Sequence, residues 1–274
     1  MKRKIINIVL IIIFIIGVLT LLYPFISQNW NKKVQSKVIK DYDMILENIK
    51  DEDYEEMFKK VEDYNQKLSK LSFPLIEYKK LKNYNKLLNI RNNGMMGYIT
   101  IDKINVSVPI YHSVKSSVLN QSVGHMEGSS LPIGGNGNHS VLSAHSGLST
   151  KRLFTDLNKL EIGDIFVINV LNKILTYQVD KIVIVEPSDV SYLDIVPNKD
   201  YVTLITCTPY AINTHRLLVR GVRVENIEEK KIIVTNEAEL IDRLVVSLFI
   251  AIPILLILFL YIMLKPVKRK VNIC

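Results

Sequence analysis

The chain has 274 residues, 48% of them hydrophobic, and a formal net charge of +8 at pH 7. This charge does not indicate a nucleic-acid groove, because the two ends of the chain contribute +3 and +4, whereas residues 96–225 contain eleven basic and eleven acidic side chains. Two long uncharged apolar stretches, one near each end, exclude a wholly soluble protein.

The first element in chain order is an apolar segment, residues 5–26, in which 22 consecutive residues carry no charge. A bilayer core of about 30 Å is spanned by roughly 20 helical residues, so the segment is long enough to cross it. The apolar run is longer than the core of a secretory signal, and no small-residue cleavage site follows it. We therefore interpret residues 1–27 as an uncleaved N-terminal transmembrane anchor.

A charged helical extension is predicted for residues 28–92. Apolar side chains recur at helical spacing through residues 31–72, and the acidic stretch KDEDYEE in their middle is typical of the N-terminus of a second helix. Pro74 then interrupts the pattern, and a third short helix is expected after it. We interpret this extension as a spacer or packing element outside the membrane.

The pattern changes at Asn93-Gly94, a turn signal, after which short runs typical of β-strands follow one another. Only brief helices are expected between the strands, over residues 117–123 and 150–157. Strands joined by short turns favour a mainly antiparallel β-barrel or sandwich. Residues 93–226 are therefore predicted to form one mainly β domain.

A second apolar segment, residues 244–264, follows a charged linker, residues 227–243, and precedes a basic tail, residues 265–274. Basic residues flank the outer side of each apolar segment, so the positive-inside rule predicts two transmembrane helices with both termini in the cytoplasm. The domain between them then lies outside the cell. Cys274 and Cys207 are on opposite sides of the membrane in this topology and cannot form a disulfide.

Cys207 stands at the end of a predicted strand in the stretch TLITCTPYAINTHRLLVRG. A strand, a loop and a returning strand form a hairpin, which brings Arg216 close to Cys207. A guanidinium beside a thiol favours the thiolate and can also stabilise an oxyanion. A free cysteine is more often a small buried apolar residue, so the residues alone leave both interpretations open.

A cysteine nucleophile also needs a proton carrier, and His145 is the favoured one of the five histidines. It follows an apolar strand and enters a Ser/Gly loop, where functional side chains are often held. His215 neighbours Arg216, but alternation along a strand sends the two side chains to opposite faces. The histidine spacings match no zinc site, so no metal and no cofactor are predicted.

The stretch around Cys207, together with GHMEGSSLPIGGNGNHSVLSAHSGL, resembles the class C sortases, which polymerise pilins. The resemblance extends over residues 93–224. It implies a catalytic site formed by His145, Cys207 and Arg216. It also implies the fold class, which is a mainly β, sortase-type eight-stranded β-barrel with an N-terminal helical extension and two flanking transmembrane helices.

The chain departs from the class C pattern at several places. Ala144 and Ser146, which flank His145, differ from the family pattern, and Ala211 stands where glycine is common in the family. Class C sortases commonly carry a lid with an Asp-Pro-aromatic motif, and this chain contains no Asp-Pro dipeptide. Residues 73–92 occupy the corresponding place, as a degenerate lid region. We expect an open site, the alternative being a lid anchored by Phe73 or Tyr78.

The resemblance implies a membrane-anchored cysteine transpeptidase of a Gram-positive cell surface. It would cleave an LPxTG-like sorting signal through a thioacyl intermediate and transfer the acyl group to an amine, a pilin lysine in pilus assembly. The alternatives are a cell-wall-anchoring sortase that uses a peptidoglycan amine and a surface cysteine protease that uses water. A third alternative is a non-enzymatic scaffold that binds wall or pilus proteins.

Overall fold

The structure is a computed structural model that describes residues 2–148, 150–226 and 243–264. It divides into two compact units, one formed by residues 1–29 with 230–274 and one by residues 30–229. The predicted linker and basic tail lie outside the described residues, except for Arg243, as does Cys274.

The first unit contains apolar helix from both ends of the chain. Helix α1 (Lys2–Leu46) begins there, and α5 (Arg243–Leu264) is the helix expected over the second apolar segment. The rings of Phe14 and Phe259 stack at 4.5 Å between centroids. Among the described residues, only α1 is long and apolar enough to cross a membrane, because the apolar stretch found in α5 is shorter. The two-span topology therefore stays a prediction.

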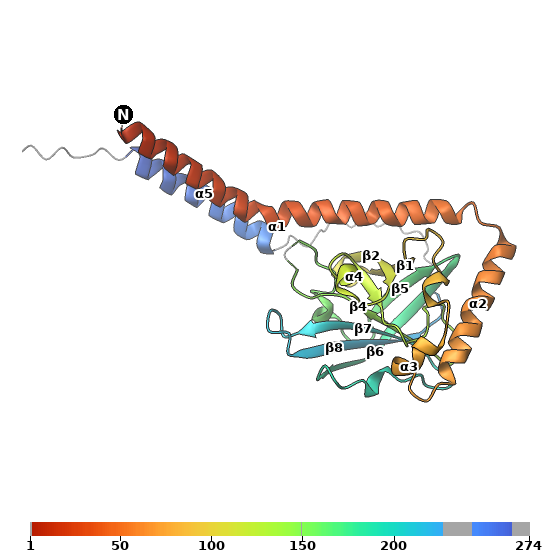
Figure 1. The fold of residues 1–274 in the computed structure, drawn as a ribbon. Coiled ribbons are helices and arrows are strands. Elements are labelled where there is room, and N and C mark those ends of the chain that lie inside the picture. Colours follow the sequence, from red (N-terminus) through yellow and green to blue (C-terminus); the bar gives the residue numbers. More distant parts are fainter. Residues whose placement is uncertain (1, 149, 227–242, 265–274) are drawn as a thin grey trace, which may run out of the picture. The chain divides into compact units, whose positions relative to one another are not determined.

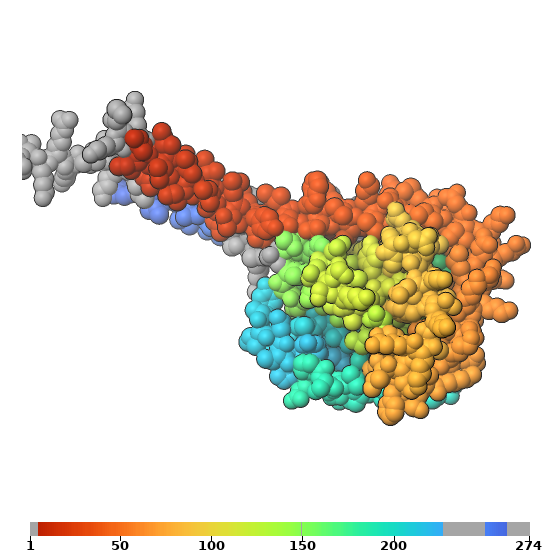
Figure 2. Space-filling model, in the orientation of Figure 1, coloured from red at the N-terminus to blue at the C-terminus, as the bar shows by residue number. Residues whose placement is uncertain are grey.

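The helical extension belongs to the second unit. α1 continues past its apolar segment to Leu46, and α2 (Asp51–Ser69) follows after a short turn. Acidic side chains fill the first turn of α2, where they complement the positive end of the helix dipole. The apolar face of α2 packs against the barrel core, and its residues, drawn in orange in Figure 2, lie along one side of the barrel.

The third helix expected after Pro74 is shorter than a regular helix. The chain forms a single turn, α3 (Pro74–Glu77), then two 3-10 turns, η1 (Tyr78–Lys80) and η2 (Tyr84–Lys86). Asn83 and Leu88 have positive φ angles of 78° and 58°, which a helix cannot contain. These two residues break the segment into turns.

Eight strands form a closed barrel in the order β1-β2-β3-β4-β7-β8-β6-β5, which confirms the predicted fold class of the domain (Figure 1). The strands are β1 (Met95–Ile101), β2 (Val106–His112), β3 (Val123–His125), β4 (Asn138–Ser143), β5 (Ile165–Val170), β6 (Lys173–Val185), β7 (Asp200–Thr208) and β8 (His215–Arg223). Most neighbours are antiparallel, as predicted, but β2 pairs with β3 and β4 pairs with β7 in parallel. The β4–β7 pair positions the site described below.

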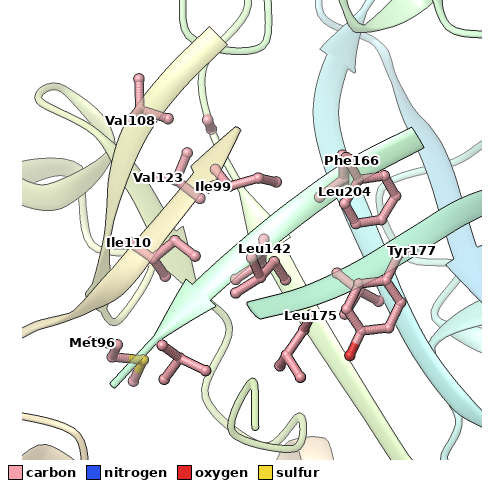
Figure 3. Packing of buried hydrophobic residues seen from close by; sticks show 14 of the residues in the cluster. Met96, Ile99, Val108, Ile110, Val123, Leu142, Phe166, Leu175, Tyr177 and Leu204 are labelled. Carbon is pink, nitrogen blue, oxygen red and sulfur yellow. The ribbon is translucent and has the colours of Figure 1, made fainter. Parts of the chain in front are cut away.

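The core fills the inside of the barrel. Apolar side chains from opposite walls meet there, among them Ile110, Leu142, Leu204 and the stacked rings of Phe166 and Tyr177 (Figure 3). These side chains are almost fully buried. Burial on one face of each strand explains the alternating sequence pattern of the domain.

The prediction of a brief helix over residues 150–157 is wrong. The chain there forms turns that lead into η4 (Leu157–Lys159), because Leu153 and Phe154 are adjacent in sequence and both buried in the core. A surface helix would not bury two consecutive side chains so completely. The other brief helix is present in part, as α4 (Ser116–Leu119).

Candidate active site

Cys207 lies on the outer face of the barrel, near the end of β7. Val202 and Leu204 of this strand belong to the inner core, whereas Ile205 belongs to a smaller cluster on the outer face. Because side chains alternate along a strand, Cys207 shares the face of Ile205. Its thiol is free and the residue is partly exposed, so this cysteine is not a fully buried core residue.

Arg216 is the direct cross-strand partner of Cys207 in the antiparallel β7–β8 ladder. Directly opposed residues of a ladder have their side chains on the same face, so the predicted proximity of Cys207 and Arg216 is confirmed. The guanidinium donates from Nη1 to the carbonyl oxygens of Asn213, at 3.2 Å, and His215, at 3.0 Å. In the described part of the chain its other nitrogens have no protein acceptor, so they are available to a bound carbonyl.

His215 pairs with Thr208 and is therefore on the opposite face of β8 from Arg216. Its side chain is exposed, and its ring Nδ1 lies 2.9 Å from the hydroxyl of Thr214.

His145 follows β4 on the other side of β7. The parallel ladder ends at the pair Ser143–Ile205, and His145 follows Ser143 by two residues as Cys207 follows Ile205. Beyond the ladder the amide of Ala144 still donates to the carbonyl of Ile205 at 3.1 Å, and the buried Thr206 hydroxyl donates to the carbonyl of Ala144 at 2.9 Å. The three predicted site residues thus come from adjacent positions in the order β4, β7, β8.

Thr206 was missed by the sequence reasoning, although it stands directly before Cys207. Alternation along β7 turns its side chain inward, where it is 4% exposed. Its hydroxyl replaces the ladder hydrogen bond at the point where β4 ends. It thereby fixes the backbone on which His145 stands.

The other three histidines are buried in the structure. His125 lies between the hydroxyl of Tyr84, 2.9 Å away, and the carbonyl of Ser130, and burial lowers its pKa to about 4. Burial also lowers the pKa of His112 and of His139, whose Nε2 lies 2.7 Å from the hydroxyl of Thr203. Burial thus favours the neutral form of all three rings.

The loop between β7 and β8 contacts the loop after His145. The ring of Tyr210 lies so close to Gly147 that a Cβ on this glycine would be 2.9 Å from it, and the glycine has φ of +82°. Ala211 keeps a φ of +65° although it carries a Cβ, at a strain of about 1–2 kcal/mol. The loop therefore keeps a left-handed conformation at the position where the family commonly has glycine.

The lid region contacts the apolar surface beside the site. Leu75 of α3 packs on the outer cluster that contains Ile205, and a Cβ on Gly128 would come within 2.6 Å of the Cα of Leu75. The expected anchor Phe73 is 66% exposed, so Leu75, and not Phe73, packs this segment against the barrel. Tyr78 packs against the inner core cluster instead. The open access of the thiol itself stays a prediction.

Two surface cavities, of about 720 and 470 Å³, are lined in large part by α2, and neither is lined by a predicted site residue. Within the described ranges no group of three or more histidine, cysteine or acidic side chains could hold a metal ion.

Comparison with known proteins relates this chain to one family. The Sortase domain family matches residues 99–224. Sortase A of Streptococcus agalactiae serotype III (strain NEM316) is 31% identical over 134 residues, which cover 47% of this chain and 53% of that protein. The chain thus spans about half the length of this curated relative.

Solved structures of class C sortases are similar over the whole of their length. Sortase C1 from Streptococcus agalactiae has a TM-score of 0.64 and 45% sequence identity, covering 70% of this chain and 100% of that one. Sortase C from Clostridium perfringens, solved with the C-terminal cell wall sorting motif, has a TM-score of 0.60 and 43% identity, covering 69% and 99%.

Proposed function

Because this chain belongs to the sortase family, we propose that it is a membrane-anchored cysteine transpeptidase that cleaves an LPxTG-like sorting signal and transfers the acyl fragment to an amine. The observation that supports this most directly is the register of β7, in which Cys207 pairs with Arg216 of β8 and Ile205 pairs with Ser143 at the end of β4, two residues before His145. A nucleophile, a proton carrier and an oxyanion donor then share one end of the barrel.

The first half of the reaction forms a thioacyl intermediate. His145 takes the proton of the Cys207 thiol, and the thiolate attacks the threonyl carbonyl of the sorting signal. Arg216 donates through its remaining nitrogens to the oxygen, which becomes an oxyanion. The carbon–nitrogen bond then breaks, and His145 returns the proton to the leaving glycine amine.

The second half transfers the acyl group. An incoming amine attacks the thioester, His145 accepts one of its protons, and the carbon–sulfur bond breaks to release the Cys207 thiolate. A new amide bond joins the sorting-signal threonine to the acceptor. Water in place of the amine gives hydrolysis, so the acceptor must compete with water for the same intermediate.

We propose a pilin lysine as the acceptor, as in pilus assembly. This is supported by the similarity to solved class C sortases over their full length. The other acceptors are a peptidoglycan amine, which would make the protein a cell-wall-anchoring sortase, and water, which would make it a surface protease.

Product analysis tests this function. The full-length chain in detergent micelles is incubated with an LPxTG-type peptide, alone or with a lysine-containing pilin domain or a peptidoglycan stem peptide. Mass spectrometry is expected to find the peptide joined to the pilin lysine in excess over the hydrolysed acid. Hydrolysis alone in all three reactions would identify a protease, and absence of any cleavage would contradict the transpeptidase.

We also propose that both termini are cytoplasmic and that the barrel lies outside the cell. Lysine and arginine residues at both ends of the chain support this orientation. Protease added to intact cells should then remove the barrel but spare peptide tags placed at Met1 and Cys274. Digestion of either tag would contradict the two-span arrangement.

A mutation at Thr206 should affect turnover more than folding. Valine has the shape of threonine but cannot donate to the carbonyl of Ala144, so Thr206→Val should displace His145. Loss of one net hydrogen bond, about 1 kcal/mol, predicts a fall in kcat of about fivefold to tenfold. Thr176→Val is the matched control, since Thr176 is equally buried at 4% exposure but bonds to Asn226. Equal kcat losses in the two variants would contradict a role for Thr206 at the site.

A further inference from the structure

One stripe of α1 docks on the barrel over the part of the helix that follows the apolar segment. Asn31, Gln35, Ile39, Tyr42 and Leu46 recur every three or four residues and so lie on one face of the helix. Leu46 packs against the inner core cluster, and Ile39 is buried. The other three form hydrogen bonds with the rest of the unit. This part of α1 is therefore a component of the barrel unit.

Tyr42 fixes the helix to the barrel. Its side chain is fully buried, its hydroxyl donates to the carbonyl of Met96 in β1 at 3.0 Å, and it accepts a hydrogen bond from the amide of Leu171 at 3.0 Å. The ring of Tyr98 contacts it edge-on. With Tyr42 fixed, the positions of the preceding turns of the helix are fixed as well, because an α-helix is stiff over three turns.

Asn31, three turns before Tyr42, contacts the segment that supports His145. Its side-chain amide donates to the carbonyl of Thr150 at 3.1 Å. Residues 150–155 in turn hold the backbone at the site: the amide of Phe154 donates to the carbonyl of His145 at 3.3 Å, and Thr155 accepts from the amide of Gly147 at 3.0 Å. One hydrogen bond thus joins α1 to Thr150, and four residues further along the chain another joins Phe154 to the backbone of His145.

A second contact supports the same side of the barrel. One turn beyond Asn31, Gln35 donates to the carbonyl of Gln121 at 3.2 Å. The ammonium of Lys151 donates to the carbonyl of the neighbouring Asn120 at 3.0 Å. The residues after Thr150 are thus held both directly by Asn31 and through the loop that Gln35 contacts.

We propose that Asn31 is a positioning residue for His145, and that the helix emerging from the apolar segment is part of the framework of the active site. This rests on the proposed function, in which His145 carries the proton. The loop after His145 contains residues with positive φ, Gly147 and Leu153, and its described residues form no regular helix or strand. The side-chain amide of Asn31, on a fixed helix, holds this loop from outside by one hydrogen bond.

The test uses the full-length chain in detergent micelles. Asn31→Asp keeps the shape of the side chain but removes the donor, and we expect kcat to fall about fivefold, the effect of one net hydrogen bond, with KM unchanged. Asn31→Ala removes the donor without adding a charge and should act in the same direction. The matched control is Asn48→Asp, since the amide of Asn48 donates to the carbonyl of Met44 at 2.8 Å, within the helical extension.

A second readout does not depend on catalysis. Trypsin can cleave after Lys151 and Arg152, inside the segment that Asn31 holds, and the rate of this cleavage relative to other sites reports how firmly the segment is held. We expect cleavage there to accelerate several-fold in both Asn31 variants and to stay unchanged in Asn48→Asp. Mass spectrometry of the fragments measures it.

The two readouts separate the outcomes. Unchanged cleavage and unchanged kcat in folded Asn31 variants would overturn the proposal, and so would faster cleavage with unchanged kcat, because the loop would then not set the position of His145. A kcat loss equal to that of the control would overturn it as well. If the parent chain turns over no sorting peptide, the proposed function fails, and the cleavage rates alone still decide whether Asn31 holds the segment.

Discussion

Replacement of Cys207 by alanine is expected to abolish cleavage of an LPxTG-type peptide, lowering kcat/KM by at least about a thousandfold, because no other group at the site can form the thioacyl intermediate. The side chain is small and partly exposed, so its loss should leave the barrel folded. Peptide cleavage is followed by mass spectrometry and the fold by thermal unfolding. The acyl-enzyme, visible as a mass increase of the parent protein, should be missing in the variant.

The chain supplies its own control for this experiment. Cys274→Ala removes the second cysteine, which is remote in sequence from every site residue, and should leave turnover unchanged. Comparable loss in both variants would point to a general effect of thiol removal. Retained turnover in a folded Cys207→Ala variant would remove the nucleophile from the mechanism altogether.

The second large effect is expected at His145. General acid–base catalysis contributes about a hundredfold to ten-thousandfold, so His145→Ala should lower kcat by at least about a hundredfold. His215→Ala should lower it by less than about tenfold, because this side chain is exposed on the face of β8 opposite to Arg216. Steady-state kinetics on both variants at several pH values compares them.

The pH profile makes this comparison specific. Loss of the proton carrier should flatten the pH dependence of kcat/KM in His145→Ala, whereas His215→Ala should keep the profile of the parent. Equal losses in the two variants would indicate a site with two functional histidines or a wrong assignment of the proton carrier. Thermal unfolding of both variants excludes misfolding as the cause.

The parts of the site that are close in sequence could be predicted from the sequence. A strand, a six-residue loop over residues 209–214 and a returning strand can close only as a hairpin, so Cys207 and Arg216 had to meet. Alternation then assigns His215 to the face opposite Arg216, whereas the outer position of Cys207 became clear only from the structure. Each of these steps depends on geometry within about 20 residues.

The contribution of β4 could not be derived in this way. The parallel pairing of β4 with β7 joins strands about 60 residues apart, and nothing in the local pattern of either strand selects the other as its neighbour. The strand end marks His145 as a candidate, but its assignment to the same site as Cys207 came from the family resemblance. The contacts of Thr206 and Asn31 follow from that pairing and from the docking of α1, and both were missed.

The turns after residue 150 show a different limit of prediction from the sequence. Residues 150–157 have helical propensity, but Leu153 and Phe154 are drawn into the core side by side. Tertiary burial decided the conformation against the local preference. The same burial brings the amide of Phe154 to the carbonyl of His145.

The central place of β7 between β4 and β8 also sets the order in which the site can assemble during folding. Arg216 reaches Cys207 when one hairpin with a short loop closes, a step of small entropic cost. The backbone beside His145 is joined to β7 across 62 residues, so it arrives only when the distant strands pair and the barrel closes. In the proposed topology the barrel folds after the chain has crossed the membrane, so the newly exported chain would hold its thiol without the proposed proton carrier. On the proposed function, the complete site then forms only together with the native barrel.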